Sequence, residues 1–233
     1  MLRKSQLLPL LVLLPLTVSA QTRQFDTDVS NVALLTLTSV KKDLAITESQ
    51  RAKMNAHASK YNAISQELQK KVRDGKQVTE ADSKRMNDEL SAMRGKVLNE
   101  LSGYQVKRLR EITLQDAGLI AVTQKEVAAY LGIAPAIQTK MRTAFENGYK
   151  SSQAVYDKAY KPINDKYKNR KPKTDAEKEA LSKEIQAAMQ KANAAARPKA
   201  LAVEKATENS VLKMLSAAQQ AKWKALLGKP FKA

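Results

Sequence analysis

A five-residue pattern that recurs four times is the feature that most constrains how this chain can fold. In its fullest form, a hydrophobic residue is followed by Thr or Ser, two variable positions and Gln. The pattern predicts a helix start, because the hydroxyl can accept a hydrogen bond from the third helical N–H while the Gln side chain reaches back to the N–H of the hydroxyl residue. The motif residues are Ile46, Thr47 and Gln50; Leu101, Ser102 and Gln105; Ile133 and Pro135; and Leu215, Ser216 and Gln219.

The third copy of the pattern is degenerate. Ala134 and Ile137 stand where the other copies carry the hydroxyl residue and Gln. Pro135 partly compensates, because its fixed φ suits the first position of a helix. One side-chain cap is worth about 1 kcal/mol of helix stability. We therefore interpret the motif as a signal for helix starts rather than as a binding signature.

The spacing of the copies indicates an internal duplication. A shift of 87 residues places Val40, Leu44, Ile46, Lys53 and Met54 on Val127, Leu131, Ile133, Lys140 and Met141. A shift of 114 residues places Val97, Leu98, Leu101, Ser102, Gln105, Leu109 and Ile112 on Val211, Leu212, Leu215, Ser216, Gln219, Trp223 and Leu226. The shifts differ by 27 residues (114 − 87), so the second copy has grown between its two matched ends.

Hydrophobic residues three or four positions apart dominate the stretches between the motif copies, and this spacing is that of one helix face. The chain has no Cys, seven Gly and seven Pro, so there are few turn or strand signals. We predict an all-α fold of long antiparallel helical hairpins, arranged as two tandem modules in an extended or curved bundle. The modules span residues 21–119 and 120–233, and the second contains an enlarged basic hairpin at about 156–197. Pro162 and Pro198 are expected to kink, end or split their helices.

Residues 1–20 are predicted to form a signal peptide. Arg3 and Lys4 precede a short apolar run, and Val18-Ser19-Ala20 supplies the small residues of a cleavage site before Gln21. The run is shorter than the ~20 residues that span a bilayer. We therefore expect a periplasmic or secreted protein that is cut after Ala20. Removal of this segment lowers the formal net charge from +18 to +16, because it takes away two basic residues and no acidic one.

Several LTxxQ-like strings in a Lys-rich, helical chain with a signal peptide resemble the Spy/CpxP family of periplasmic LTxxQ-motif proteins. The "LLGKPF" string near the end is similar to tails of longer, duplicated relatives. The resemblance implies long bent helices in thin, curved cradles that are often dimeric. It also implies ATP-independent chaperones or stress-response regulators of the bacterial envelope. Two modules in one chain could imitate the family's dimer, so we expect either a homodimer or a pseudo-dimeric monomer.

The most distinctive surface segment lies between Lys158 and Lys173, where seven basic residues accompany one acidic residue and tyrosines interleave. The lysines could simply solvate a hairpin tip that the tyrosines pack. Alternatively, the segment attracts acidic chains by charge and holds them by its aromatic side chains. The candidate client-binding residues are Tyr156, Lys158, Tyr160, Lys161, Lys166, Tyr167, Lys168, Arg170, Lys171 and Lys173.

Other function classes find little support in the sequence. With one histidine, His57, and no cysteine, we expect no metal site, and His57 is expected to be packed or half-exposed. No catalytic triad or Gly-rich phosphate loop can be assembled, so we expect neither an enzyme nor a cofactor. No nucleic-acid-binding motif is present. The expected partners are unfolded or acidic polypeptides, with a single envelope sensor protein or an anionic envelope polymer as the alternative.

Overall fold

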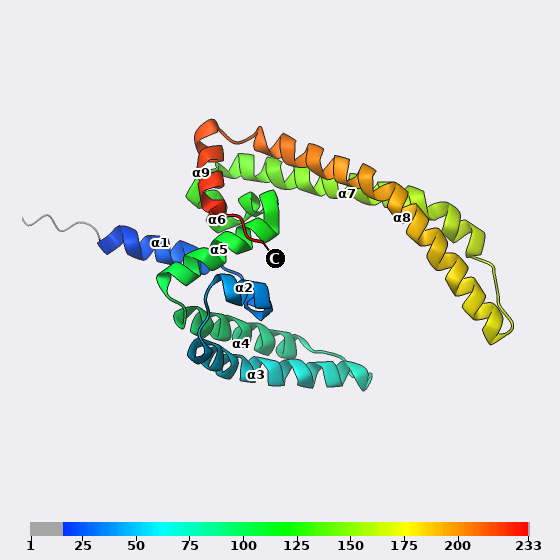
Figure 1. Cartoon of the computed structure of the whole chain (residues 1–233), viewed down its shortest axis with the longest axis horizontal. Helices are drawn as coiled ribbons and strands as arrows, with labels where there is room; N and C mark the ends of the chain where they lie inside the picture. The colour runs from blue at the N-terminus through cyan, green and yellow to red at the C-terminus, as the bar shows by residue number, and fades with distance from the viewer. Residues whose placement is uncertain (1–15, 233) are drawn as a thin grey trace, which may run out of the picture. The chain divides into compact units, whose positions relative to one another are not determined.

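The computed structural model describes residues 16–232 of the chain, and within that range it consists of helices joined by turns and short loops, without a strand (Figure 1). The prediction of an all-α fold is confirmed. The first 15 residues of the predicted signal peptide lie outside the described range. Its last five residues form the first part of α1 (Leu16–Val29), which continues past the predicted cleavage site. No helix in the described range is long and apolar enough to cross a membrane.

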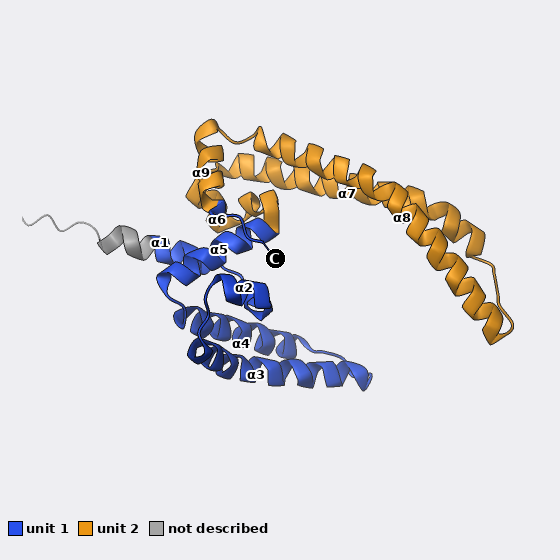
Figure 2. Cartoon of the chain, in the orientation of Figure 1, with its two compact units in different colours: residues 1–116, 227–233 blue, residues 117–226 orange. Residues whose placement is uncertain are grey.

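The chain divides into two compact units, coloured separately in Figure 2. Unit 1 comprises Met1–Asp116 together with Leu227–Ala233, and unit 2 comprises Ala117–Leu226. The boundary falls three residues before the one predicted from the sequence. The last seven residues belong to unit 1 instead of the second module, because they pack on the fifth helix rather than on their own neighbours in sequence.

Unit 1 is built around a helical hairpin and a central buried helix. Its elements are α1, η1 (Val32–Thr36), α2 (Thr38–Asp43), α3 (Glu48–Arg73), α4 (Glu80–Asn99) and α5 (Gly103–Ala117). Helices α3 and α4 pair along their length and form hairpin 1. The core joins the base of this hairpin to α2 and α5 through Val40, Met54, Val97 and Leu109, with Phe231 from the end of the chain packed at its edge.

Unit 2 contains a longer hairpin on a smaller base. Its elements are η2 (Gly118–Thr123), α6 (Lys125–Leu131), α7 (Pro135–Tyr167), α8 (Asp175–Leu212) and α9 (Ala217–Leu227). Helices α7 and α8, of 33 and 38 residues, form hairpin 2, which curves along its length in Figure 1. Met141 and Val211 are completely buried at its base. The core therefore sits where the hairpin meets α6 and α9, and the hairpin extends away from it.

Element boundaries repeat with the two spacings found in the sequence. Helices α3 and α7 begin 87 residues apart (135 − 48), and α5 and α9 begin 114 residues apart (217 − 103). Ala45 and Gly132, again 87 residues apart, both have positive φ, at 49° and 68°. Left-handed backbone is costly for Ala and free for Gly. The same turn before the hairpin is therefore made in both units, in unit 1 with a strained residue.

Of the outcomes expected for the two prolines, an end or a split of the helix does not occur. Helix α7 runs through Pro162 to Tyr167, and α8 runs through Pro198 to Leu212. Proline removes one intrahelical hydrogen bond and frees the carbonyl four residues earlier. Both prolines are exposed, so water can solvate the freed carbonyls of Lys158 and Ala194. Pairing with the opposite helix of the hairpin then keeps each helix continuous.

Candidate functional site

Three of the four motif copies form capping boxes. The Thr47 hydroxyl accepts from the Gln50 N–H at 3.1 Å, while the Gln50 side chain accepts from the Thr47 N–H at 3.1 Å. Ser102 with Gln105, and Ser216 with Gln219, make the same pair of bonds at 3.2 and 2.9 Å. In the degenerate copy, α7 begins at Pro135 after Ala134, which supplies no side-chain cap.

The motif glutamines also join separate helix starts, which the sequence analysis missed. The Gln50 amide donates to the Glu100 carbonyl at 2.9 Å and to the Gln105 side chain at 2.8 Å. The Gln105 amide in turn donates to the Leu44 carbonyl at 3.0 Å. In unit 2, Gln219 donates to the Gly132 carbonyl at 2.9 Å. The sequence did contain a signal for these contacts, namely that three of the four copies keep Gln. The long Gln side chain can close its own capping box and still reach a second helix.

His57 lies next to this junction and is half-buried, bound to the Glu100 carboxylate at 3.0 Å. Lys53 approaches the other oxygen of Glu100 at 3.2 Å. The hydrogen bond from His57, and then that from Lys53, lower the pKa of Glu100 below its ordinary value. His57 therefore takes part in a polar contact that ties α3 to the end of α4. In the described part of the chain, no three side chains of the metal-binding types gather in one place.

The predicted client-binding residues all lie in the half of hairpin 2 that is remote from the core. Tyr156, Tyr160 and Tyr167 lie on α7 and are half-buried, and the rings of Tyr156 and Tyr160 stack with centroids 6.1 Å apart. We call residues 153–195 the distal segment. It contains no fully buried side chain, whereas Ser152 and Ala196 at its ends are buried. Its apolar residues are therefore shared between the helix pair and solvent.

The seven basic residues between Lys158 and Lys173 fall into two groups. Lys161, Lys166 and Arg170 make ion pairs of 2.9–3.1 Å, the last two with the same carboxylate of Glu184. The bond to Glu184, together with Tyr167, raises the pKa of Lys166, and the pKa of Glu184 is lowered mainly by Lys166. The exposed side chains of four others make no ion pair to any described residue: Lys158, Lys168, Lys171 and Lys173. These four are available to an anionic partner.

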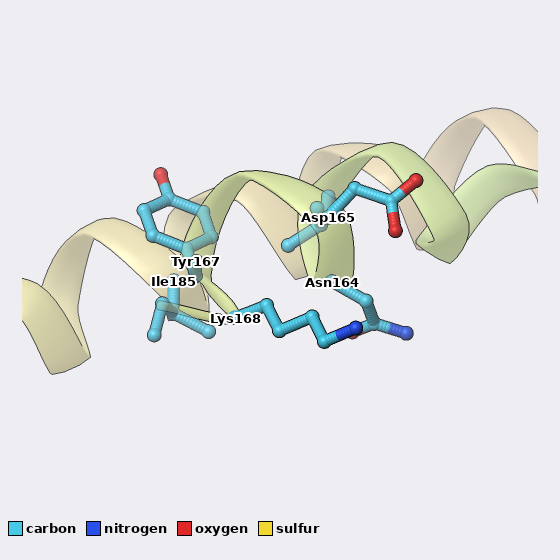
Figure 3. A pocket seen from close by; sticks show the side chains of 6 residues that line it. Asn164, Asp165, Tyr167, Lys168 and Ile185 are labelled. Atoms are coloured by element: carbon cyan, nitrogen blue, oxygen red, sulfur yellow. The ribbon is translucent and has the colours of Figure 1, made fainter. Parts of the chain in front are cut away.

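Shallow hollows flank the end of this segment. Figure 3 shows one of them, where the Tyr167 ring and the Ile185 side chain lie beside the Lys168 stem, with Asn164 and Asp165 at its edge. Another lies between Pro172, Leu181 and Ile185. Both are open to solvent and combine apolar walls with nearby charged groups. The arrangement suits loose contact with a chain laid along the hairpin and offers no enclosed site for a small substrate.

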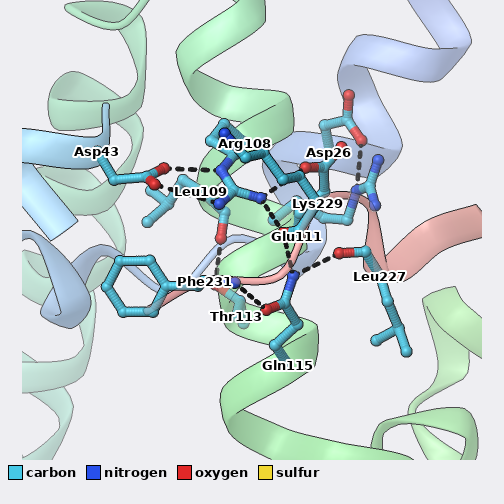
Figure 4. A network of polar contacts seen from close by, with 11 residues as sticks. Asp26, Asp43, Arg108, Leu109, Glu111, Thr113, Gln115, Leu227, Lys229 and Phe231 are labelled. Atoms are coloured by element: carbon cyan, nitrogen blue, oxygen red, sulfur yellow. Dashed lines mark hydrogen bonds and ion pairs between the residues drawn. The ribbon is translucent and has the colours of Figure 1, made fainter. Parts of the chain in front are cut away.

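A second cluster of polar residues lies in unit 1, on α5 (Figure 4). The buried Arg108 guanidinium binds Asp43 at 2.7 and 3.2 Å, Glu111 at 3.0 Å and the Lys229 carbonyl at 2.5 Å. Its bond to Asp43 lowers the pKa of that carboxyl and raises that of Arg108. Arg110, also buried, binds Asp26 of α1 at 2.9 Å. Sequence reasoning did not find these residues, since all their partners except Glu111 lie 65 or more positions away.

Comparisons with known proteins leave this site without a precedent. No family model matches the chain, no curated protein matches it, and no solved structure matches it.

Proposed function

We propose that this chain is an exported, non-enzymatic binding protein that captures unfolded or acidic polypeptides without ATP, in the manner of an envelope chaperone. One observation carries the proposal. The distal segment of hairpin 2 leaves its apolar and aromatic residues half-exposed and surrounds them with unpaired lysines. A hairpin built only to stabilise itself would gain by covering these side chains, because each buried apolar side chain is worth about 1.5–3 kcal/mol.

The two features act at different stages of binding. The positive charge accelerates the encounter with an acidic chain over distances set by the Debye length, about 8–10 Å at physiological salt. Tyr156, Tyr160 and Tyr167 then contact the bound chain, since tyrosine combines a large apolar ring with a polar hydroxyl. The hollows at Ile185 accept apolar side chains without enclosing them. Binding of this kind is fast, broad in specificity and readily reversible.

The resemblance to the LTxxQ-motif proteins agrees with this proposal. We propose two tandem LTxxQ modules, with hairpin 1 in the first and hairpin 2 in the second. The repeated helix starts and the three capping boxes support that arrangement. On this view the chain is periplasmic or secreted, and the two modules stand in for the family's dimer. Light scattering on a sizing column tests the last point, because a stable dimer would remove the argument for a pseudo-dimeric monomer.

The decisive experiment measures protection of an aggregating client. Purified protein starting at Gln21 is mixed with an acidic client, and light scattering is followed across a salt series. We expect suppression that weakens as salt rises. Replacing Tyr156, Tyr160 and Tyr167 together with Ser should reduce it several-fold at every salt concentration. The matched control is Tyr104→Ser, which removes a ring on α5 that is 74% exposed and lies outside the hairpin.

A second pair of variants separates charge from apolar contact. Replacing Lys158, Lys168, Lys171 and Lys173 with Gln should slow capture and flatten its salt dependence. The control replaces four exposed lysines elsewhere and thus keeps the same net charge: Lys107, Lys125, Lys213 and Lys222. Absence of suppression at any stoichiometry would sink the proposal. One specific partner in a pull-down, without protection of generic clients, would favour a regulatory protein that binds a sensor or an anionic polymer.

A further inference from the structure

The residues after α9 lie on α5 of unit 1 and have no regular secondary structure. We call Gly228–Lys232 the C-terminal strap. Its path is visible in Figure 4, where Phe231 lies beside Gln115 and near Arg108. The proposed binding surface is the distal segment of unit 2, so the contacts of the strap with α5 are not explained by that function.

Side chains of α5 form hydrogen bonds with the backbone of residues 227–231. None of these bonds involves a side chain of that segment. The Gln115 carbonyl oxygen accepts from the Phe231 N–H at 2.7 Å, and the Gln115 amide donates to the carbonyls of Leu227 and Lys229 at 2.5 and 2.8 Å. Arg108 donates to the same Lys229 carbonyl at 2.5 Å. Pro230 has no N–H, and none is needed at its position. These contacts would accept any extended peptide of similar backbone path.

Two positions add sequence selectivity. Phe231 packs half-buried against the hydrophobic core of unit 1, so an aromatic or large apolar residue is favoured there. Gly228 has φ of 60°, and a Cβ at this position would overlap the Glu111 carboxylate. Both facts favour Gly over any residue with a side chain. The groove therefore selects the pattern Gly-X-X-aromatic.

The groove is held by contacts other than those to the strap. Asp43 binds Arg108 through two bonds, and Glu111 binds it through a third, so the guanidinium keeps its position when the strap leaves. The side chains of Lys229, Pro230 and Lys232 are exposed and contribute little. A short tether gives an attached segment an effective concentration on the order of millimolar. Weak intrinsic affinity is thus enough to fill the groove with the chain's own end.

We propose that this groove of unit 1, formed by Arg108, Gln115, Glu111 and the core around Phe231, is a peptide-binding site. Its resident occupant is the strap, and its external ligand is an extended polypeptide segment with the pattern Gly-X-X-aromatic. The strap regulates the site by competing with that ligand. This inference does not rest on the proposed chaperone activity, since it uses a different unit and different residues.

The test weakens the strap in the full chain and supplies the segment as a peptide. The probe is a fluorescent peptide with the sequence of residues 225–232, Ala-Leu-Leu-Gly-Lys-Pro-Phe-Lys, and binding is measured by anisotropy. Removing the Phe231 ring costs the strap its apolar anchor, so Phe231→Ala should bind the peptide at least about tenfold more tightly than the wild-type chain. Adding Gln115→Ala to this variant should abolish binding.

Matched peptides check the selectivity. Replacing the peptide's Phe with Ala, or its Gly with Ala, should remove binding, whereas replacing the Lys that follows Gly should change little. Circular dichroism establishes that each variant retains its helices. The proposal is overturned if the folded Phe231→Ala chain gains no affinity for the peptide. It is equally overturned if Phe231→Ala unfolds unit 1, because the strap is then a fixed part of the core. Replacing the distal tyrosines with Ser in the Phe231→Ala chain should leave its affinity for the peptide unchanged.

Discussion

The two hairpins of this protein begin with the same kind of turn but differ in how much apolar surface their paired helices bury. In hairpin 1, apolar residues are buried well along its length, as at Met54, Ile64 and Leu68. Basic side chains reach across to the buried carboxylates of Glu89 and Asp82 and to the exposed one of Glu67: Lys60 to Glu89 at 2.6 Å, Lys71 to Asp82 at 2.8 Å and Arg85 to Glu67 at 2.8 Å. Hairpin 1 thus holds itself together by its own contacts.

Hairpin 2 is longer and less well covered. Near its base the helices approach closely at small residues such as Gly148, Ser152 and Ala200. Beyond Ser152 the pairing leaves every side chain at least partly exposed until Ala196. Isolated helix pairs bury little apolar area, so stability falls toward the tip. The extra length of hairpin 2 thus supplies accessible surface rather than core.

The largest expected difference concerns leucines at similar depths of the two hairpins. Leu68→Ala removes a buried side chain between α3 and α4 and should cost about 2 kcal/mol of local stability. Leu181→Ala removes a half-exposed side chain from α8 and should cost below about 1 kcal/mol. Hydrogen exchange resolved by segment measures both, because the units can open separately. Equal costs would show that hairpin 2 is as well packed as hairpin 1.

The next largest change in stability is expected for substitutions of two glycines inside helices. Alanine at Gly95 of α4 meets no atom within 4 Å, so Gly95→Ala should raise stability by about 0.5–1 kcal/mol through helix propensity. Alanine at Gly148 of α7 would place its Cβ 2.8 Å from Thr207 Cγ2, so overpacking should exceed that gain and leave a net loss of about 1 kcal/mol. Thermal unfolding of the two variants shows whether each substitution raises or lowers stability.

A third variant tests the reason for the loss. Thr207→Ala removes the two atoms closest to the new methyl group, Oγ1 and Cγ2, and leaves Cβ, so adding it to Gly148→Ala should recover part of the stability. No recovery would mean that the close approach of α7 and α8 is not the cause. Stabilisation by Gly148→Ala alone would contradict the close packing itself.

The parts of the fold that were predictable depend on local chemistry. Thr47 with Gln50 and Ser102 with Gln105 start helices through bonds between residues three positions apart, so five letters of sequence suffice. Neither proline ends its helix, and the reason is related. Local preference disfavours a helix through Pro162, and tertiary pairing with α8 outweighs it. Pairing partners cannot be read from a single local stretch.

The exposure of individual apolar residues also could not be predicted from the helical period. Val72 and Leu90 belong to the apolar faces of α3 and α4, yet they are 62% and 38% exposed. Tyr149 shares the face of Met141 and Phe145 and is 71% exposed. A helical period shows which residues share a face and not how wide the covering neighbour is. Likewise, Asp43 and Lys229, two of the partners of Arg108, lie 65 and 121 residues away, and no spacing rule indicates them.

The weakest effect that we expect distinguishes the two hairpin tips, where α4 and α8 each start with a capping box. In hairpin 1, Asp82 closes the box of Thr79 and also binds Lys71 at 2.8 Å, and these bonds, Lys71 first, hold the pKa of Asp82 at about 2 instead of the ordinary 3.8. In hairpin 2, Glu177 closes the box of Thr174 and makes no ion pair to a described residue.

Because its pKa is lower in the folded state, ionised Asp82 stabilises hairpin 1 fully above pH about 4, and this contribution disappears as the pH falls through about 2. Asp82→Asn should therefore weaken hairpin 1 at pH 7 and match the wild-type chain near pH 2. Glu177→Gln keeps a capping side chain and breaks no ion pair across hairpin 2, so it should change stability much less at pH 7. Thermal unfolding of the three proteins between pH 7 and pH 2 measures the effect. If both substitutions lowered stability equally, the cap would be the common cause, and Lys71 would not distinguish the tip of hairpin 1 from that of hairpin 2.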